Sequence, residues 1–423
     1  MRYSRRRFLK ASALAAAAPA VLASHVLGAG PAAPSNRITM GFIGIGKQGE
    51  YHLRGLVKNN EVRILGISEV YKQFRDMAVD LVNSTYGSSD CKGYVDYREM
   101  LARDDIQAVL IAVPDHWHAL CVIEAARRGK DIYCEKPLSL TIRGANLMTG
   151  AVRRYGSVFQ TGSQQRSSRE FRQACQLVRN GRIGRIKTVH VNVGGPSRPC
   201  DLPGEPTPDG LDWDRWLGPA PLRPFNAILR PPHNKSFPNW RAYREYSGGG
   251  MTDWGAHHFD IAQWGLGKDG SGPVAIYPPG TRHPKMLTYV YADGTPMYRG
   301  GQTDDGRKVN GVLFTGEKGW VEVNRGRLTT EPESLRTLKA GPNDVHLYQS
   351  PGHHRDWLQC IRTRKRPICD VAIGASSVTV CHLGNIAYWL KRPLKWNPKK
   401  QDFVGDREAS RWVDRPRRAP YTL

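Results

Sequence analysis

The stretch RITMGFIGIGKQG, residues 37–49, decides the fold of this chain. Its apolar first half predicts a buried strand, and the glycines that follow have the GxGxxG spacing. Gly44 permits a tight turn, Gly46 lets the backbone approach a pyrophosphate, and Gly49 lets the following helix pack closely on the strand. A plain glycine turn is the alternative, but the position between a strand and a helix favours a dinucleotide-binding loop that includes Ile45.

An acidic residue follows at the distance that such a loop requires. Residues 62–67 predict a second strand, and Glu69 lies 20 residues beyond Gly49 (69 − 49 = 20), where a carboxylate holds the ribose hydroxyls of a dinucleotide. That carboxylate repels a 2′-phosphate and so favours NAD. Lys72 and Arg75 nearby leave NADP open as the alternative.

Further strands and helices alternate at the spacing of βαβ units. An apolar run at 106–113, a helix at 119–128 and a short strand at 131–134 predict a doubly wound parallel sheet, whose ligands collect at the carboxyl ends of its strands. Two motifs follow such ends, and from them we expect these cofactor-binding residues: Pro114, His116, His118, Glu135 and Lys136. Simple packing is an equal alternative for the two histidines.

The order of these motifs, closed by Glu135-Lys136-Pro137, resembles the Gfo/Idh/MocA family of glucose–fructose oxidoreductase and inositol dehydrogenase. The resemblance implies an NAD(P)-binding Rossmann domain at 34–157. It also implies, at 158–423, a substrate-binding α+β domain with an open, mostly antiparallel sheet and a C-terminal tail, and assembly into a homo-oligomer, a dimer or tetramer. Alternating runs at 286–291, 309–315 and 320–324 predict strands of that second sheet.

The stretch GGGMTDWGAHHFD, residues 248–260, is either a metal site or an acid–base device. On a helix that begins after the glycines, Asp253 and His257 are four residues apart and share a face, whereas His258 points elsewhere. Zinc sites favour histidines at i and i+4, which adjacent histidines cannot supply, so we expect no metal here. A structural Asp–His pair with its hydrogen bonds satisfied is the other alternative. In the family that the chain resembles, such an Asp and His work with the lysine of Glu-Lys-Pro, which implies Lys136, Asp253 and His257 as the catalytic residues.

The chemistry of alcohol oxidation explains these residue types. His257 can take the hydroxyl proton, Lys136 can stabilise the developing alkoxide, and Asp253 can orient a neighbour; the sequence leaves open which of Lys136 and His257 is the formal base. A further set of residues lies where substrate hydroxyls or a sugar ring are expected, with ordinary packing as the alternative: Gln165, Arg166, Trp240, Tyr243 and His258.

The N-terminus predicts export. Residues 4–10, SRRRFLK, closely resemble the twin-arginine motif, and a short apolar run broken by Pro19 and His25 follows, which is typical of an export signal and not of a membrane span. We therefore expect residues 1–33 to be a signal and linker read by the twin-arginine machinery. The mature protein would be periplasmic or otherwise exported, with no integral membrane segment and with a cofactor inserted before export.

The bulk composition limits the possible partners. The formal charge of +24 is scattered and no nucleic-acid-binding motif accompanies it, so we expect no nucleic acid partner. The eight cysteines form no CxxC pair, which argues against a zinc ribbon or redox motif. The sequence thus predicts an NAD(P)-dependent oxidoreductase that acts on a secondary hydroxyl of a sugar, sugar derivative or cyclitol. The alternatives are a glycoside-cleaving enzyme that oxidises its substrate transiently and a non-catalytic sugar-binding protein.

Overall fold

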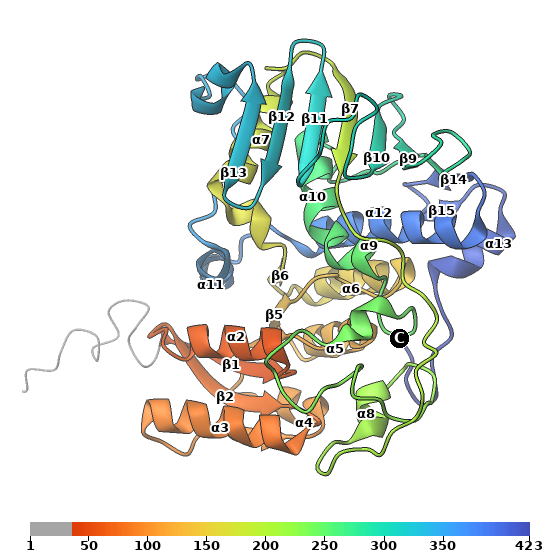
Figure 1. Ribbon diagram of the computed structural model, residues 1–423. Coiled ribbons are helices and arrows are strands. Elements are labelled where there is room, and N and C mark those ends of the chain that lie inside the picture. The colour runs from red at the N-terminus through yellow and green to blue at the C-terminus, as the bar shows by residue number, and fades with distance from the viewer. Residues whose placement is uncertain (1–35) are drawn as a thin grey trace, which may run out of the picture.

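The computed structural model describes residues 36–423, so the predicted export segment at 1–33 lies outside the described residues. Two sheets organise the chain, a parallel one near the N-terminus and a larger one beyond it, with helices packed between them (Figure 1). This arrangement confirms the predicted pairing of a Rossmann unit with an α+β unit.

The first sheet has six parallel strands in the order β3-β2-β1-β4-β5-β6. Its strands are β1 (Ile38–Ile43), β2 (Val62–Ser68), β3 (Lys92–Tyr94), β4 (Ala108–Ile111), β5 (Asp131–Cys134) and β6 (Phe159–Thr161). Its helices are α2 (Lys47–Leu56), α3 (Lys72–Tyr86), α4 (Tyr97–Leu101), α5 (Asp115–Arg127) and α6 (Ile142–Tyr155). The buried side chains of α2 and α3 belong to one apolar cluster and those of α4, α5 and α6 mainly to another, as expected for a sheet covered on both faces.

Two predicted boundaries in this unit are wrong. The domain boundary at 157 precedes β6, which pairs in parallel with β5 and completes the first sheet. The helix predicted at 119–128 begins at Asp115, because Pro114 is its N-cap and the polar residues that follow form its first turn. Pro at or next to a helix start is favourable, since its fixed φ suits that position.

The second sheet has nine strands in the order β13-β12-β11-β7-β10-β9-β8-β14-β15. It is mostly antiparallel, as predicted, and only β7 and β10 run in parallel. The strands are β7 (Ile186–Val191), β8 (Ala275–Tyr277), β9 (Leu287–Val290), β10 (Pro296–Arg299), β11 (Val312–Gly316), β12 (Trp320–Asn324), β13 (Arg327–Glu331), β14 (Leu394–Asn397) and β15 (Asp402–Phe403).

The helices of the second unit carry the candidate site and link it to the first sheet. They are η2 (Gln164–Ser167), α7 (Arg169–Arg179), α8 (Trp213–Leu217), η3 (Asn239–Ala242), α9 (Gly250–Asp253), α10 (Gly255–Leu266), η4 (Glu333–Thr337), α11 (His353–Thr363), α12 (Val371–Leu390), α13 (Arg407–Ser410) and η5 (Arg411–Val413). The single helix expected after the glycines is divided at Trp254 into α9 and α10.

Among the described residues, α12 is the one helix long and apolar enough to cross a membrane, but 78% of its most apolar window is buried inside the fold. It packs against α10 on one side and α6 on the other, so it belongs to the core between the two sheets. All eight cysteines are unpaired, and the seven that are buried pack as small apolar side chains.

The glycine loop yields a stability test. A Cβ at Gly49 would lie 2.1 Å from the Gly44 carbonyl oxygen, so Gly49→Ala forces the loop or α2 to shift and should lower the free energy of unfolding by about 2–3 kcal/mol. Gly55 lies in the same helix, and a Cβ there would meet no atom within 4 Å, so Gly55→Ala should stabilise by about 0.5–1 kcal/mol. Chemical denaturation of both variants checks this, and equal effects would contradict it.

Candidate active site

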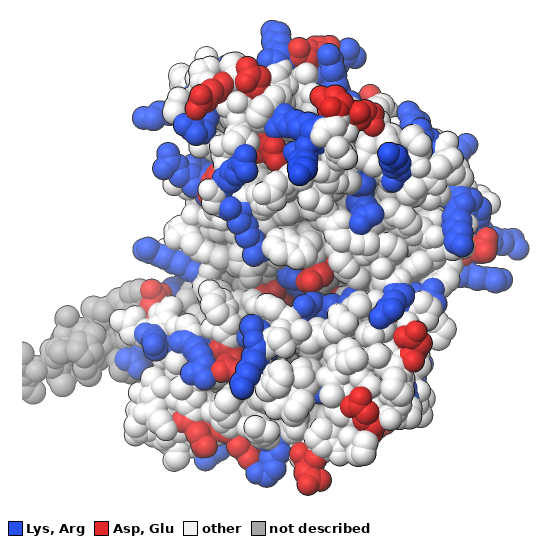
Figure 2. All heavy atoms as spheres, viewed as in Figure 1, with Lys and Arg blue, Asp and Glu red and all other residues white. Residues whose placement is uncertain are grey.

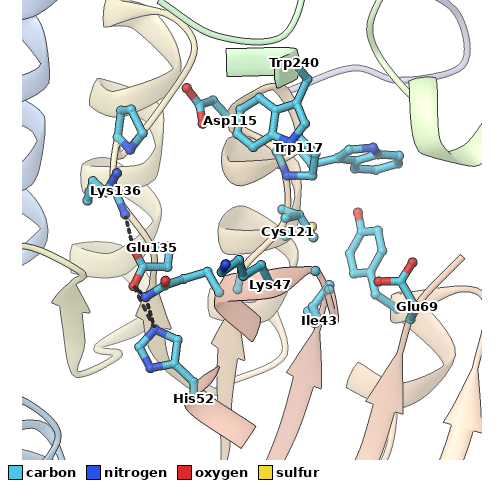
Figure 3. A pocket seen from close by; sticks show the side chains of 18 of the residues that line it. Ile43, Lys47, His52, Glu69, Asp115, Trp117, Cys121, Glu135, Lys136 and Trp240 are labelled. Carbon is cyan, nitrogen blue, oxygen red and sulfur yellow. Dashed lines mark hydrogen bonds and ion pairs between the residues drawn. The ribbon is translucent and has the colours of Figure 1, made fainter. Parts of the chain in front are cut away.

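A cavity of about 1440 Å³ lies at the carboxyl ends of the first sheet and is lined by both units. Pockets for one small ligand usually measure about 300–1,000 Å³, so this cavity has room for two molecules side by side. Glu69 and Lys136 occupy opposite ends of it (Figure 3). The two ends differ in chemistry.

At the first end, the glycine loop leaves open space over the start of α2. Gly44 has φ +88° and a Cβ there would lie 2.7 Å from the Ala112 carbonyl oxygen, whereas Gly46 has no atom within 4 Å of a Cβ position. Within residues 36–423 no side chain caps the N-terminus of α2, so its first N–H groups are open to a ligand. Free N–H groups beside an open glycine are the cradle that a pyrophosphate requires, so these residues fit a dinucleotide.

The Glu69 carboxylate forms part of the cavity wall at this end. It accepts hydrogen bonds from the backbone N–H groups of Ile45, at 2.7 Å, and Tyr71, at 3.0 Å. It therefore holds the glycine loop against the end of β2 while still lining the cavity. Ile45 and Gly49 do not line the cavity, because the Ile45 side chain is buried and Gly49 lies under the glycine loop. Both residues therefore support the loop without facing the cavity.

At the opposite end, Glu135 is the centre of a buried polar network. Its Oε1 accepts from Gln48 Nε2 at 3.2 Å and Gln164 Nε2 at 3.0 Å, and His52 Nε2 lies 2.8 Å from the same atom (Figure 3). Burial alone would raise the pKa of Glu135, but His52 and the Lys136 charge outweigh it and hold that pKa well below the usual range. Glu135 is therefore a fixed carboxylate that positions α2 and β5 relative to each other.

Lys136 and Asp253 meet across the cavity from different units. Lys136 Nζ lies 2.6 Å from Asp253 Oδ1, and Arg241 Nε lies 3.2 Å from Asp253 Oδ2. Burial would raise the pKa of Asp253, but the charges of Lys136 and Arg241 hold it below its usual value. The carboxylate thus aims the ammonium group of Lys136 into the cavity and remains ionised while doing so.

His257 lines the same end of the cavity one turn after Asp253. Burial, reinforced by the positive charges of Lys136 and Arg325, lowers its pKa well below the usual value. The ring is therefore neutral at neutral pH and can accept a proton. Its Nδ1 has no hydrogen-bond partner among the residues that the structure describes, so no protein contact fixes the tautomer.

Other predicted residues are divided between the cavity and the interior. Pro114, Gln165 and Trp240 line the cavity, and both amide atoms of Gln165 lack a partner within residues 36–423. An amide without a partner beside a cavity is suited to bind substrate hydroxyls.

Arg166 does not line the cavity. Its guanidinium lies 2.7 Å from Asp260 Oδ2 and 2.6 Å from Asp269 Oδ1 and is 1% exposed, so its position does not support a substrate contact. Tyr243 is likewise buried away from the cavity, in the apolar cluster of the first unit. Arg166 stays inside the fold because two carboxylates compensate its buried charge. Tyr243 stays there because its ring packs in the apolar cluster.

The predicted histidines next to these motifs are also structural. The two ring nitrogens of His118 lie 2.7 Å from the Pro137 carbonyl and 2.9 Å from that of Val113, which joins the two motif loops. His116 Nε2 lies 3.1 Å from the Trp216 carbonyl, and His258 Nδ1 lies 3.2 Å from that of Asn192. None of the three lines the main cavity, so packing, the alternative interpretation, describes them better than cofactor or substrate contact.

Several residues that line the catalytic end were not predicted. They are Trp254, Arg325 and His354, which come from three separate segments. Arg325 lies over the Trp254 ring at 4.8 Å, and Arg241 over the Phe237 ring at 4.8 Å. Arg241 also lines the cavity, and its position next to Trp240, just before the glycines, predicts from the sequence that it adds charge to a sugar pocket.

Asp115 is the most unusual group that the sequence did not single out. It is 2% exposed, accepts a 2.6 Å hydrogen bond from the Ser247 hydroxyl, and its Oδ1 has no partner in the described part of the chain. Burial raises its pKa to about 7 against the opposing effects of Ser247 and Lys136. A carboxyl group that is partly protonated at neutral pH therefore lies beside the catalytic end.

The raised pKa of Asp115 gives a pH-dependent stability prediction. The folded state binds this proton more tightly than the unfolded state, so the contribution is full below pH 3.8 and is lost as the pH rises towards 7. Asp115→Asn keeps the Ser247 bond without the charge. Its stability relative to the native protein should grow by about 2–4 kcal/mol between pH 4 and pH 8, measured by urea unfolding.

The matched control is Asp76→Asn, because Asp76 pairs with Lys72 on the surface and both are substantially exposed. Its stability relative to the native protein should change by less than about 1 kcal/mol over the same pH range. A flat difference for Asp115→Asn would show that the carboxyl group is ionised normally in the fold.

Family models match the chain over nearly all of the described residues. Residues 38–163 match the model described as oxidoreductase family, NAD-binding Rossmann fold, and residues 197–423, more than half of the chain, match oxidoreductase family, C-terminal alpha/beta domain. The crystal structure of aldose-aldose oxidoreductase from Caulobacter crescentus has a TM-score of 0.58 at 18% identity, over 85% of this chain and 99% of that one.

Two curated proteins illustrate the relatives at the level of sequence. The uncharacterized oxidoreductase YrbE of Bacillus subtilis is 30% identical over 165 residues, 39% of this chain and 47% of that protein. Inositol 2-dehydrogenase of Burkholderia multivorans is 25% identical over 248 residues, 58% of this chain and 59% of that protein. The chain thus spans about half the length of the curated relatives it matches. Both domain models agree with the order of the motifs and with the two sheets, and the chain belongs to the Gfo/Idh/MocA oxidoreductase family.

Proposed function

We propose that this protein is an NAD(P)-dependent oxidoreductase that acts on a secondary hydroxyl of a sugar, sugar derivative or cyclitol. The observation that carries the proposal is the pairing of Lys136 with Asp253 at 2.6 Å, beside the neutral ring of His257, in a cavity whose other end is a dinucleotide cradle. The name of the Burkholderia relative, inositol 2-dehydrogenase, supports a cyclitol or a sugar as the substrate class.

The bound dinucleotide would supply the hydride acceptor. The chain's own residues would manage the proton. Lys136 would donate a hydrogen bond to the substrate oxygen and stabilise the negative charge that develops on it, while Asp253 keeps the ammonium group in place. His257 is neutral and lines the same space, so it can receive the hydroxyl proton while Lys136 stays charged. Lys136 can be the base instead only as the neutral amine, after it has given up a proton, and it then becomes the charged group beside the alkoxide.

The test is the near-ultraviolet absorbance of the purified protein with a panel of monosaccharides, glycosides and cyclitols. One class of compound should produce the reduced-nicotinamide band. Lys136→Ala should lower the rate by about 10²–10⁴-fold, because it removes the group that stabilises the charge on the substrate oxygen or, in the alternative, takes its proton.

Lys268→Ala is the matched control, because Lys268 pairs with Asp293 at 2.8 Å and does not line the cavity. Its rate should stay within about twofold of the native rate. A glycoside that disappears without lasting reduction would favour the transient-oxidation enzyme. Sugar binding without turnover, unchanged in Lys136→Ala, would favour the non-catalytic binding protein.

We also propose that the protein is exported by the twin-arginine machinery to the periplasm or beyond, with its cofactor already tightly bound. The sequence SRRRFLK at residues 4–10 supports this. Replacing Arg5 and Arg6 by Lys removes the paired arginines but keeps the charge. It should retain the protein on the inner side of the membrane, as measured by cell fractionation, and unchanged export would contradict the proposal.

Assembly into a dimer or tetramer through the open second sheet stays a prediction. Figure 2 shows Lys and Arg spread over the displayed face, intermixed with Asp and Glu, without one continuous basic patch. The absence of a nucleic acid partner likewise stays a prediction.

A further inference from the structure

The C-terminal segment forms part of the wall of the main cavity. Pro420, Tyr421, Thr422 and Leu423 line it together with residues of the first sheet's loops. The end of the chain lies beside α5, between the two units (Figure 1). These four residues therefore belong to the cavity wall of this chain.

Arg418 anchors this segment to the rest of the chain. Its guanidinium donates to Asp214 Oδ1 at 2.5 Å and to the carbonyl oxygens of Asp214 and Gly218, each at 2.9 Å. Its backbone N–H donates to the Pro219 carbonyl at 3.0 Å. Because four hydrogen bonds fix Arg418, the residues that follow it have a defined position at the cavity wall.

The anchored segment completes an aromatic surface. The Tyr421 ring lies edge-on to Trp117 at 5.2 Å, and Trp117 lies edge-on to Tyr97 at 5.9 Å. Trp117 is fixed in turn, since its Nε1 donates to the Trp216 carbonyl at 3.0 Å and its ring leaves no room for a Cβ at Gly218. All three aromatic residues line the cavity, alongside the apolar Cys121 and Ile123.

This surface lies at the Glu69 end of the cavity and away from Lys136. The Glu69 N–H donates to the Tyr94 carbonyl at the end of β3, and Tyr97 follows three residues later at the start of α4. An acid at the end of the second strand marks the adenosine ribose of a bound dinucleotide. The aromatic surface is therefore next to the place where the adenine ring would lie, beyond the ribose.

We propose that the segment Pro420–Leu423, with Tyr97 and Trp117, forms the subsite that binds the purine ring of the dinucleotide. The inference rests on the proposed function, because it requires a dinucleotide in this cavity. A planar, weakly polar ring gains most from aromatic and apolar neighbours, and base–aromatic contacts are tolerant of the base that they take. The segment would slow coenzyme release by covering the purine, since the chain must move before the ring can leave.

The experiment compares two fluorescent probes, NADH and reduced nicotinamide mononucleotide, which lacks the adenosine half. Tyr421→Ala should raise the dissociation rate of NADH about tenfold, equivalent to about 1.4 kcal/mol, when NADH is chased with excess NAD. Truncation after Ala419, which keeps Arg418, should raise it at least as much. The affinity for reduced nicotinamide mononucleotide should stay within about twofold, because that probe does not reach the aromatic surface.

Two further variants serve as controls. Tyr421→Phe keeps the ring and should behave like the native protein. Tyr155→Ala removes an exposed tyrosine, 41% accessible at the end of α6, that does not line the cavity, and it should leave both probes unaffected.

The outcomes separate this inference from the proposed function. If the native protein binds neither probe, the proposed function itself fails. If it binds both but Tyr421→Ala and the truncation release NADH at the native rate, the purine subsite is wrong while the proposed function stands. Equal loss of both probes would also overturn the subsite, since it would place the effect at the nicotinamide end or on folding.

Discussion

The contact between Lys136 and Asp253 is the interaction on which the arrangement of the site depends. Lys136 follows β5 of the first sheet, and Asp253 ends α9 of the second unit, so one ion pair joins both units across the cavity. The side chains are only 17% and 21% exposed, which weakens screening by solvent without removing it. Arg241 holds the second carboxylate oxygen, so the pair keeps one geometry and does not alternate between partners.

Close backbone packing places Asp253 where this contact can form. Gly249 has φ +74°, and a Cβ at Gly250 would lie 2.7 Å from Gly194, so the turn before α9 presses directly against the chain that leaves β7. A larger residue at Gly250 would push α9 away and move Asp253 with it. The glycines at 248–250 therefore act through space, by setting the distance between α9 and the end of β5.

Segments of the second unit also enclose the coenzyme end of the cavity. Asn234 Nδ2 donates to the Ile45 carbonyl at 2.9 Å and to Glu50 at 3.0 Å, and Lys47 Nζ donates to the Lys235 carbonyl at 2.6 Å. The long irregular segment that precedes the glycines thus returns to the glycine loop. Together with the C-terminal segment it covers a crevice that the first sheet alone would leave open.

The sequence by itself determined the features that depend on local geometry. A strand, a glycine loop and an acidic residue at a fixed distance imply the same backbone in any βαβ unit. A spacing of four residues places Asp253 and His257 on one side of a helix, and this holds although a break at Trp254 divides that helix. Only the tertiary structure decided what depends on distant neighbours. Arg166 is buried because Asp260 and Asp269, far along the chain, compensate its charge. Asp115 has a raised pKa because the fold removes water from it. The last residues line the cavity because Asp214 and Gly218 hold Arg418 in place. Spacing along the chain does not encode those contacts, since burial and charge pairing depend on which segments the two sheets bring together.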